Sequence, residues 1–153
     1  MEVKSTYENL IFTTVRIETK LKNGNTSTGT GFIFSYPVRD GSELYIVTNK
    51  HVIKDAAQGK LEFTIAKNSA PDLGNKYTVS INDFERFWIG HKNDDIDIAI
   101  MPFVPILEDL KRKDIEIFFR AISSELIPEN SDLEEIDAVE DIIVIGYPNG
   151  IYD

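Results

Sequence analysis

Apolar residues at every second position recur in short segments through the first hundred residues of this chain. The segment at residues 60–67, for example, alternates Leu61, Phe63 and Ile65 with polar neighbours. A period of two puts side chains on opposite faces of a β-strand, so such a segment predicts a strand with one buried face. This alternation and the content of β-branched residues predict six strands, at residues 11–21, 28–36, 44–49, 60–67, 77–83 and 95–103. Six short strands indicate an all-β fold, either a small closed barrel or a sandwich.

Turn signals separate these segments, and the pattern changes after Phe103. Asp40-Gly41 is typical of a tight turn between two strands. Residues 106–122 predict a helix at their start and extended chain towards their end, and an acidic connector follows. Residues 141–153 begin with an apolar run suited to a buried strand and continue into a Gly-Tyr-Pro-Asn-Gly turn.

The composition limits the classes of partner and site. The chain has 153 residues, enough for one ordinary domain with a hydrophobic core. A formal net charge of −10 disfavours binding to nucleic acid or to an anionic membrane surface. The absence of cysteine excludes disulfides, thiolate metal sites and a cysteine nucleophile, and it favours a cytoplasmic location. No stretch approaches the roughly 20 apolar residues of a spanning helix, and neither a signal peptide, a metal nor a cofactor is expected.

His51, one of two histidines, follows directly on the strand expected at residues 44–49, and the sixth expected strand opens with Asp95-Ile96-Asp97. In a small barrel, a histidine at the end of one strand can meet a carboxylate on another. A carboxylate that holds an imidazole in one tautomer and stabilises its cation is the base-and-orienter pair of nucleophilic catalysis. Taken alone, such a pair is more often structural or solvated than catalytic.

Four motifs between residues 28 and 150 give the pair a context. In order along the chain they are GTGFIF, YIVTNKHVI, DIDIAIMPF and IIVIGYPNG. They resemble the trypsin-like serine peptidases, particularly the bacterial, disulfide-free kind similar to the Deg/HtrA proteins. In that family a Gly-rich strand precedes Thr-(Asn/Ala)-x-His-(Val/Cys), an Asp-(Ile/Leu)-Ala strand follows, and Gly-Tyr-Pro or Gly-Asn-Pro opens a second barrel. Each motif is weak by itself, and the specificity lies in their order.

The resemblance implies a role for each matching residue. His51 would be the general base, and Asp97 would orient it, because Asp97 fits the Asp-Ile-Ala motif. Asp95 is the fallback, since it lies two positions earlier and on the same side of a strand. Thr48 and Asn49 would set the turn that presents His51. Ala99, a small residue, would let the neighbouring chain approach, and an ordinary packing role in the core is equally compatible with it.

The resemblance also implies an architecture. Residues 1–104 would form a six-stranded antiparallel Greek-key barrel of the chymotrypsin type. Residues 105–140 would connect it to a second barrel, and residues 141–153 would be the first strand and turn of that second, truncated barrel. The chain would be the N-terminal part of a serine endopeptidase that cleaves polypeptide substrates. An exposed inter-barrel surface would allow self-association, and residues 142–145 would fold back on the first barrel or pair with a neighbouring chain.

The family's nucleophile matches no residue of this sequence. It lies in a Gly-(Asn/Asp)-Ser-Gly loop of the second barrel, as do the oxyanion hole and the specificity pocket, and the chain contains no such loop. The candidate serines fit turns or caps better than a nucleophile motif; they are Ser27, Ser123, Ser124 and Ser131. Loss of a triad member and of the oxyanion hole lowers the rate by orders of magnitude, so the chain by itself is expected to be inactive. The alternative is a pseudopeptidase, a binding module that keeps the fold without the activity.

Several remaining residues are expected to be structural. His91 is interpreted as a loop residue without a partner, and Trp88 and Phe87 as packing residues. Two distant histidines without cysteine argue against a zinc site. The acidic residues between positions 134 and 141 lack the loop spacing of a calcium site and predict a solvated face.

Overall fold

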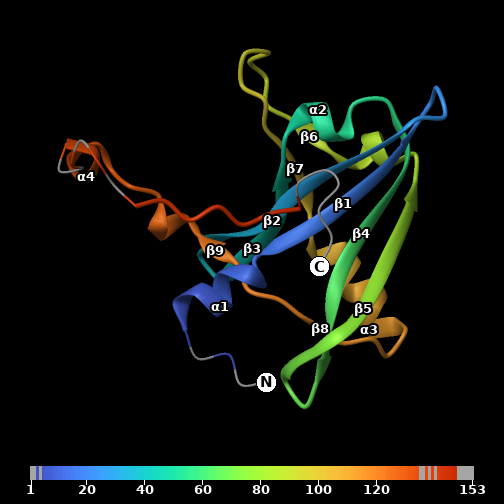
Figure 1. Ribbon diagram of the computed structural model, residues 1–153, viewed down its shortest axis with the longest axis horizontal. Coiled ribbons are helices and arrows are strands. Elements are labelled where there is room, and N and C mark those ends of the chain that lie inside the picture. Colours follow the sequence, from blue (N-terminus) through green and yellow to red (C-terminus); the bar gives the residue numbers. More distant parts are fainter. Residues whose placement is uncertain (1–2, 4, 135–136, 138, 140, 148–153) are drawn as a thin grey trace.

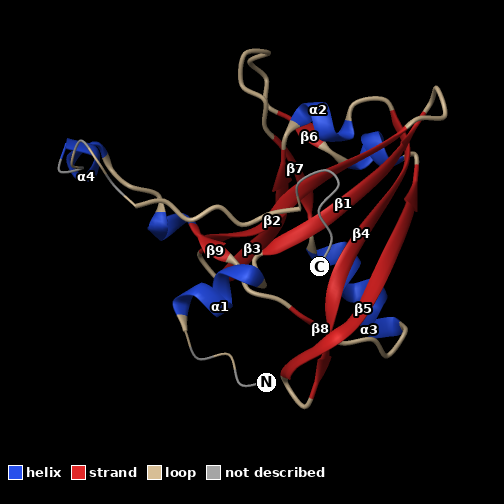
Figure 2. Ribbon diagram, viewed as in Figure 1, coloured by secondary structure: helices blue, strands red, loops and turns tan. Residues whose placement is uncertain are grey.

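The computed structural model describes residues 3, 5–134, 137, 139 and 141–147 (Figure 1). In this part of the chain nine strands belong to one sheet. They are β1 (Thr14–Leu21), β2 (Thr26–Val38), β3 (Gly41–Thr48), β4 (Ala56–Lys67), β5 (Ala70–Asn82), β6 (Ile89–Gly90), β7 (Ala99–Pro102), β8 (Ile117–Phe118) and β9 (Ile122–Ser123). The path runs β5-β4-β1-β2-β3-β7-β6, with β8 paired to β4 and β9 paired to β2 (Figure 2). All pairs are antiparallel except β2 with β9. The predominance of antiparallel sheet confirms the all-β prediction.

The described helices are short, with four to nine residues each. They are α1 (Thr6–Ile11), α2 (Lys50–Ile53), α3 (Val104–Arg112) and α4 (Asn130–Glu134), with 3₁₀ turns η1 (Phe84–Phe87) and η2 (Ser124–Leu126). Helix α2 follows the end of β3, close to β6 and β7 (Figure 1). None of these helices combines the length and the apolar character that crossing a membrane requires. The two ends of the path, β5 and β6, do not pair within the described residues, so the closed Greek-key barrel stays a prediction.

Five of the six predicted strands form close to their expected positions, and the sixth is shorter than predicted. Residues 95–98 lie in a loop, and the strand begins only at Ala99. Two polar backbone groups of this loop form hydrogen bonds with side chains and not with a neighbouring strand. The Asp95 N–H donates to Asn93 Oδ1 at 3.0 Å, and the Asp97 carbonyl accepts from Asn49 Nδ2 at 2.8 Å. Because these bonds replace strand pairing, the prediction that Asp95 and Asp97 share one side of a strand is wrong.

The core lies on one face of the sheet, as the alternation predicts. Side chains from β1, β2, β3, β4 and β7 point to this face, together with residues of η1 and α3. The largest fully buried side chains are Phe84, Phe103, Ile17, Ile33, Ile46, Leu61, Leu110 and Val15. Phe84 packs directly over β4, where a Cβ on Gly59 would lie 2.2 Å from its ring. Glycine at this position therefore leaves the space that the largest core residue of η1 occupies.

The outer face of the sheet divides into a charged half and an apolar half. Along β1, β4 and β5 the outward side chains are polar or charged, and Lys76 pairs with Glu62 at 2.7 Å. On β2, β3, β7 and β6, the strand register places the outward residues beside one another. A hydrogen bond from the His91 N–H to the Ile98 carbonyl continues the β6–β7 pairing as far as Ile98. We call four register partners on these strands, together with Ile98 just before β7, the apolar half: Phe32, Val47, Ile100, Ile89 and Ile98. Ile89 is 60% exposed and Ile98 is 45% exposed, so this half is uncovered at the β6–β7 hairpin.

The segment after Phe103 belongs to the same packed unit. Its start is helical, as predicted, and its extended part forms β8 and β9. Leu110 of α3 and both residues of β8 are buried in the core. The boundary expected at residue 104 is therefore not where packing against the sheet ends. The amphipathic helix α3 and the apolar strand β8 bury apolar side chains there, and the connector role expected of residues 105–140 stays a prediction.

The predicted strand at residues 142–145 does not form in the described part of the chain, because no other strand pairs with it. Ile142 and Val144 are 82% and 86% exposed. The segment returns to the sheet beside β2, where the Tyr147 N–H donates to Thr30 Oγ1 at 2.7 Å (Figure 1). The contact lies at Tyr147, beyond residues 142–145, so the return expected of those residues themselves stays a prediction. Most of the expected Gly-Tyr-Pro-Asn-Gly turn lies outside the described residues.

Candidate functional site

His51 is carried by α2, the helical turn that follows β3. Strand β3 pairs with β2 as far as Val47, which lies opposite Phe32, and Thr48 is the first residue beyond that ladder. Thr48 is buried and donates its hydroxyl proton to the Thr30 carbonyl at 2.9 Å. A buried carbonyl at the end of a ladder needs such a donor. The bond fixes the point at which the chain leaves the sheet, in agreement with the role expected for Thr48.

Gly29 allows α2 to lie against β2. A Cβ at this position would approach Val52 Cγ1 to 2.6 Å and Cγ2 to 2.7 Å. Val52 is buried and follows His51 directly in α2. A side chain at position 29 would therefore push on the residue next to the histidine. The Gly-rich stretch of β2 serves close packing under the site.

The loop that carries Asp97 is held against α2. At its base, the β6–β7 hairpin continues through the bond from the His91 N–H to the Ile98 carbonyl. Farther along, Asn49 Nδ2 donates to the Asp97 carbonyl at 2.8 Å, and Lys50 Nζ donates to the Asn93 carbonyl at 2.9 Å. Two consecutive residues of the histidine turn thus bind the backbone of the loop.

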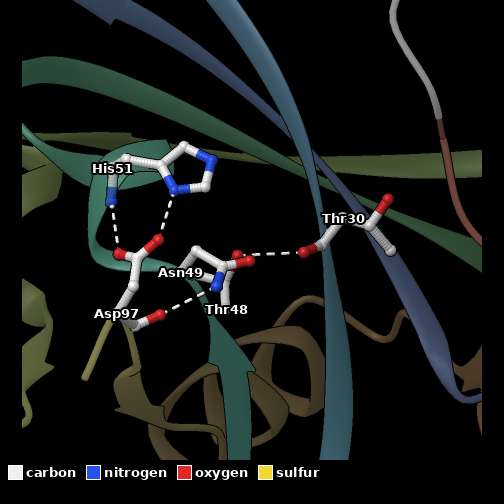
Figure 3. Close-up of polar contacts among 5 residues, drawn as sticks. All are labelled: Thr30, Thr48, Asn49, His51 and Asp97. Atoms are coloured by element: carbon white, nitrogen blue, oxygen red, sulfur yellow. Dashed lines mark hydrogen bonds and ion pairs between the residues drawn. The ribbon is translucent and has the colours of Figure 1, made fainter. Parts of the chain in front are cut away.

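His51 and Asp97 form a two-point contact (Figure 3). The ring Nδ1 lies 2.5 Å from Asp97 Oδ2, and the backbone N–H of His51 donates to Asp97 Oδ1 at 3.1 Å. Both carboxylate oxygens are therefore engaged by the same residue. The expected pairing of His51 with Asp97 within hydrogen-bond reach is confirmed. The His51 side chain is 72% exposed, and the Asp97 side chain is 44% exposed, so the pair lies at the surface.

The electrostatics of the pair fix the role of each ring nitrogen. The hydrogen bond with His51 lowers the pKa of Asp97 below its ordinary value of 3.8. Desolvation opposes this shift, and the backbone N–H of His51 adds to it. An ionised carboxylate only accepts hydrogen bonds, so Nδ1 donates and the lone pair of the neutral ring is on Nε2. Nε2 has no hydrogen-bond partner in the described part of the chain and points away from Asp97 (Figure 3).

The other predicted site residues have distinct positions. Asp95, the fallback, is exposed and does not contact His51 in the described structure. Ala99 is fully buried between Thr48 and Gly90, which are its partners on the neighbouring strands. A small residue is compatible with both expectations made for it, packing and close approach of the neighbouring chain.

His91 has a partner, contrary to the prediction. Its Nδ1 accepts a hydrogen bond from the Asn93 N–H at 3.1 Å within the β6–β7 loop, so it organises the turn that leads to Asp97. Trp88 is buried against Phe84, as predicted, at 5.5 Å between ring centroids. Phe87, in contrast, is 53% exposed, and packing does not account for it.

No serine among the described residues makes a hydrogen bond to His51. Ser27 lies within β2, Ser124 within η2 and Ser131 within α4. Ser123 caps η2, where its hydroxyl accepts from the Glu125 N–H at 3.2 Å. The turn-and-cap interpretation fits Ser123 well, whereas Ser27 is a strand residue. Within the described residues, no serine is therefore bonded to the ring of the His51–Asp97 pair.

Sequence reasoning missed Lys50, Asn93 and Thr30 as supports of the site. The contacts of Lys50 and Asn93 depend on the path of the β6–β7 loop over α2, which residue types do not encode directly. One signal was available: a long polar run between two short β-segments predicts a loop that can fold onto its surroundings. Thr30 is flanked by Gly29 and Gly31, and its carbonyl is the acceptor that Thr48 needs.

The described residues contain no cluster of three or more histidine, cysteine or acidic side chains that could hold a metal ion. A groove of about 780 Å³ lies between β4, β5, α3 and β8, remote in sequence and structure from the His51 turn. It is lined by apolar residues such as Ile65, Leu107 and Phe119.

Comparisons with protein-family models, with curated proteins and with solved structures found no match for this chain. The relation to trypsin-like peptidases rests on the four sequence motifs alone. What the structure adds is the contact between the two residues that those motifs single out.

Proposed function

We propose that this chain supplies the general base and the orienting carboxylate of a Ser-His-Asp triad, as the N-terminal part of a trypsin-like serine endopeptidase. His51 takes the proton of an attacking hydroxyl at Nε2, and Asp97 holds the ring and stabilises the imidazolium that forms. The observation that carries the proposal is the two-point contact of Asp97 with the ring Nδ1 and the backbone N–H of His51. A merely solvated ion pair does not need both oxygens on one residue.

The apolar half of the outer face supports the proposal by its location. Ile98 follows Asp97 directly, and Ile100 and Val47 continue the same face behind it. Exposed contiguous apolar residues beside a polar site are typical of protein interfaces. A unit that covers this half would approach the His51–Asp97 pair from the side of Asp97. Such a unit, in the proposed chymotrypsin-like architecture, carries the serine, the oxyanion hole and the substrate pocket.

Covering the apolar half would also strengthen the electrostatic interaction between His51 and Asp97. At its present exposure the His51–Asp97 pair is open to water, which weakens its electrostatics. Exclusion of water strengthens the interaction of the imidazolium with the carboxylate. In this proposal the chain alone does not turn over peptides, and its polypeptide substrate binds only when the covering unit is present.

The test is labelling with a fluorophosphonate, which reacts with a base-activated serine. A polypeptide that joins this chain to a following Gly-(Asn/Asp)-Ser-Gly unit from the same reading frame should label, and this chain alone should not. Asp97→Asn should lower the labelling rate by about 10⁴-fold, because the ring then loses its tautomer control. The matched control is Asp95→Asn, which changes a carboxylate of the same loop without touching His51. Equal loss in both variants, or labelling that survives His51→Ala, contradicts the proposal.

A second candidate is a non-catalytic pseudopeptidase module that binds other chains through the apolar half. Two observations favour it: no described serine bonds to His51, and Ile89 and Ile98 are exposed. The module predicts a reading frame that continues with the serine replaced, and no labelling in any context. Self-association is a separate consequence of the same surface. Light scattering over a range of concentrations should detect it, and Ile98→Glu should abolish it.

A further inference from the structure

Thr30 receives hydrogen bonds from two segments that are far apart in the sequence. Its carbonyl accepts from Thr48 Oγ1 at 2.9 Å, and its side-chain hydroxyl accepts from the Tyr147 N–H at 2.7 Å. The carbonyl and the hydroxyl point to different sides of β2 (Figure 3). One threonine thus joins the end of the described chain to the turn that carries His51.

The chain fits closely at this contact. A Cβ on Gly146 would lie 2.9 Å from Thr30 Oγ1 and 3.5 Å from its Cγ2. Only glycine lets the backbone come near enough for the next N–H to reach the hydroxyl. Tyr147 itself is half-buried, whereas Ile142 and Val144 upstream are exposed. The segment is therefore held at Gly146–Tyr147 and not along its apolar run.

The position of Thr30 makes these bonds matter for the backbone. It lies between Gly29 and Gly31, and glycines inside a strand have more conformational freedom and less packing than other residues. Bonds from outside the ladder therefore help to fix the peptide whose carbonyl holds Thr48. Asn49 follows Thr48 and donates a hydrogen bond to the Asp97 carbonyl. His51 lies two residues farther along the chain.

We propose that Thr30 is a positioning residue that couples the docking of Gly146–Tyr147 to the geometry of the His51–Asp97 pair. When the segment is docked, Thr30 is fixed, Thr48 is held and the turn presents His51 to Asp97. When another partner takes the segment away, the turn loosens. The inference rests on the proposed function for its consequence, control of a catalytic base, but the coupling itself is a property of the described residues.

Amide hydrogen exchange followed by NMR on the full chain tests the coupling. Three amides report separately: Tyr147 on docking, His51 on its bond to Asp97 Oδ1, and Ile46 on the stability of the central sheet. Gly146→Ala should expose the Tyr147 amide by steric exclusion. The His51 amide should then exchange about 2- to 30-fold faster, the range expected for couplings of this kind, while Ile46 should not change.

Substitutions at Thr30 provide the matched set. Thr30→Val removes the hydroxyl but keeps the shape and the carbonyl, and it should reproduce the effect of Gly146→Ala on His51. Thr30→Ser keeps an acceptor and should restore the wild-type exchange rates. Thr26→Val changes an exposed threonine of the same strand, at a position that also points outward, and should leave the His51 amide unaltered.

Three outcomes would overturn the coupling. The first is a Tyr147 amide that exchanges at the wild-type rate in Gly146→Ala, which would mean that the contact does not hold the segment. The second is release of Tyr147 with an unchanged His51 amide. The third is equal acceleration at His51 and Ile46, which would indicate general destabilisation. Failure of the proposed function would show in the labelling experiment and would leave these exchange rates as they are.

Discussion

Substitution of Gly29 by alanine tests whether the packing under α2 positions the site. The new Cβ would meet Val52 Cγ1 at 2.6 Å, whereas ordinary contacts of a Cβ begin at 3.4 Å. Val52 or β2 must therefore move by about 0.8 Å, the difference between these two distances. Val52 is only 5% exposed and belongs to the four-residue helix that carries His51. Little of the movement can be absorbed without shifting the histidine.

The magnitude follows from overpacking and from hydrogen-bond geometry. Insertion of a methyl group into a filled core costs about 1–3 kcal/mol. For a chain of this size each kcal/mol lowers Tm by about 2–4 °C. A shift of the same 0.8 Å would stretch the 2.5 Å contact between His51 Nδ1 and Asp97 Oδ2 beyond the usual limit of a good hydrogen bond.

Two measurements check this prediction together. Chemical denaturation gives the loss of stability, and proton NMR of the His51 ring gives the state of the Nδ1–H bond to Asp97. A double-mutant cycle with Val52→Ala sharpens the test, because that change removes both methyl groups that the new Cβ would meet. The two substitutions should be less destabilising together than the sum of the single changes, by about 0.5–3 kcal/mol.

The control is Gly90→Ala, in the β6–β7 hairpin. There the added Cβ would meet its nearest neighbour, Lys50 Cε, at an ordinary 3.5 Å. Its stability should stay within about 0.5 kcal/mol of the wild type. The packing argument is refuted if Gly29→Ala is as stable as Gly90→Ala, or if the losses at Gly29 and Val52 add without interaction.

Three further predictions follow from single contacts. Thr48→Val should lower the free energy of unfolding by about 1–3 kcal/mol, since the Thr30 carbonyl loses its donor, and Thr48→Ser should recover most of the loss in a denaturant titration. Because the His51 hydrogen bond lowers the pKa of Asp97, the stability that this pair contributes is complete above pH 3.8 and is lost as the pH falls through the lower folded-state pKa. Denaturation midpoints of the wild type and of Asp97→Asn should therefore converge on acidification below that value, and parallel curves would contradict the linkage. Gly59→Ala places a Cβ within 2.2 Å of the Phe84 ring and should destabilise by about 1–3 kcal/mol or prevent folding, with Tm as the readout.

Much of the candidate site was predictable because a histidine directly after an apolar strand is a local signal in the sequence. The strand that ends in Thr-Asn-Lys-His places His51 just beyond the end of β3, and this position depends only on the local sequence. Asp97 was chosen over Asp95 by its place in a motif, and the structure brings Asp97 to the ring. The reason for Asp95 as a fallback, a strand face shared with Asp97, is wrong, because both aspartates lie in a loop before β7.

The contacts that hold the loop could not be predicted from residue types. Lys50 and Asn93 meet because the β6–β7 hairpin folds over α2, and only the three-dimensional path of the chain brings an ammonium group to that carbonyl. At residues 142–145 the sequence predicts a strand that the described structure does not contain. The apolar run of this segment predicts a buried strand, but a strand needs a neighbour to pair with, and none lies beside it in the described structure.

Local sequence is enough to specify the alternation of buried and exposed side chains, and with it an antiparallel sheet whose core face carries Ile17, Ile33 and Ile46. That much is local, because strand geometry converts a period of two directly into two faces. The tertiary structure alone decided which distant groups meet. The contact of His51 with Asp97, and the two bonds that Thr30 receives from Thr48 and Tyr147, join segments between 18 and 117 residues apart. Their proximity depends on how all the strands pack together, and no short stretch of sequence specifies it.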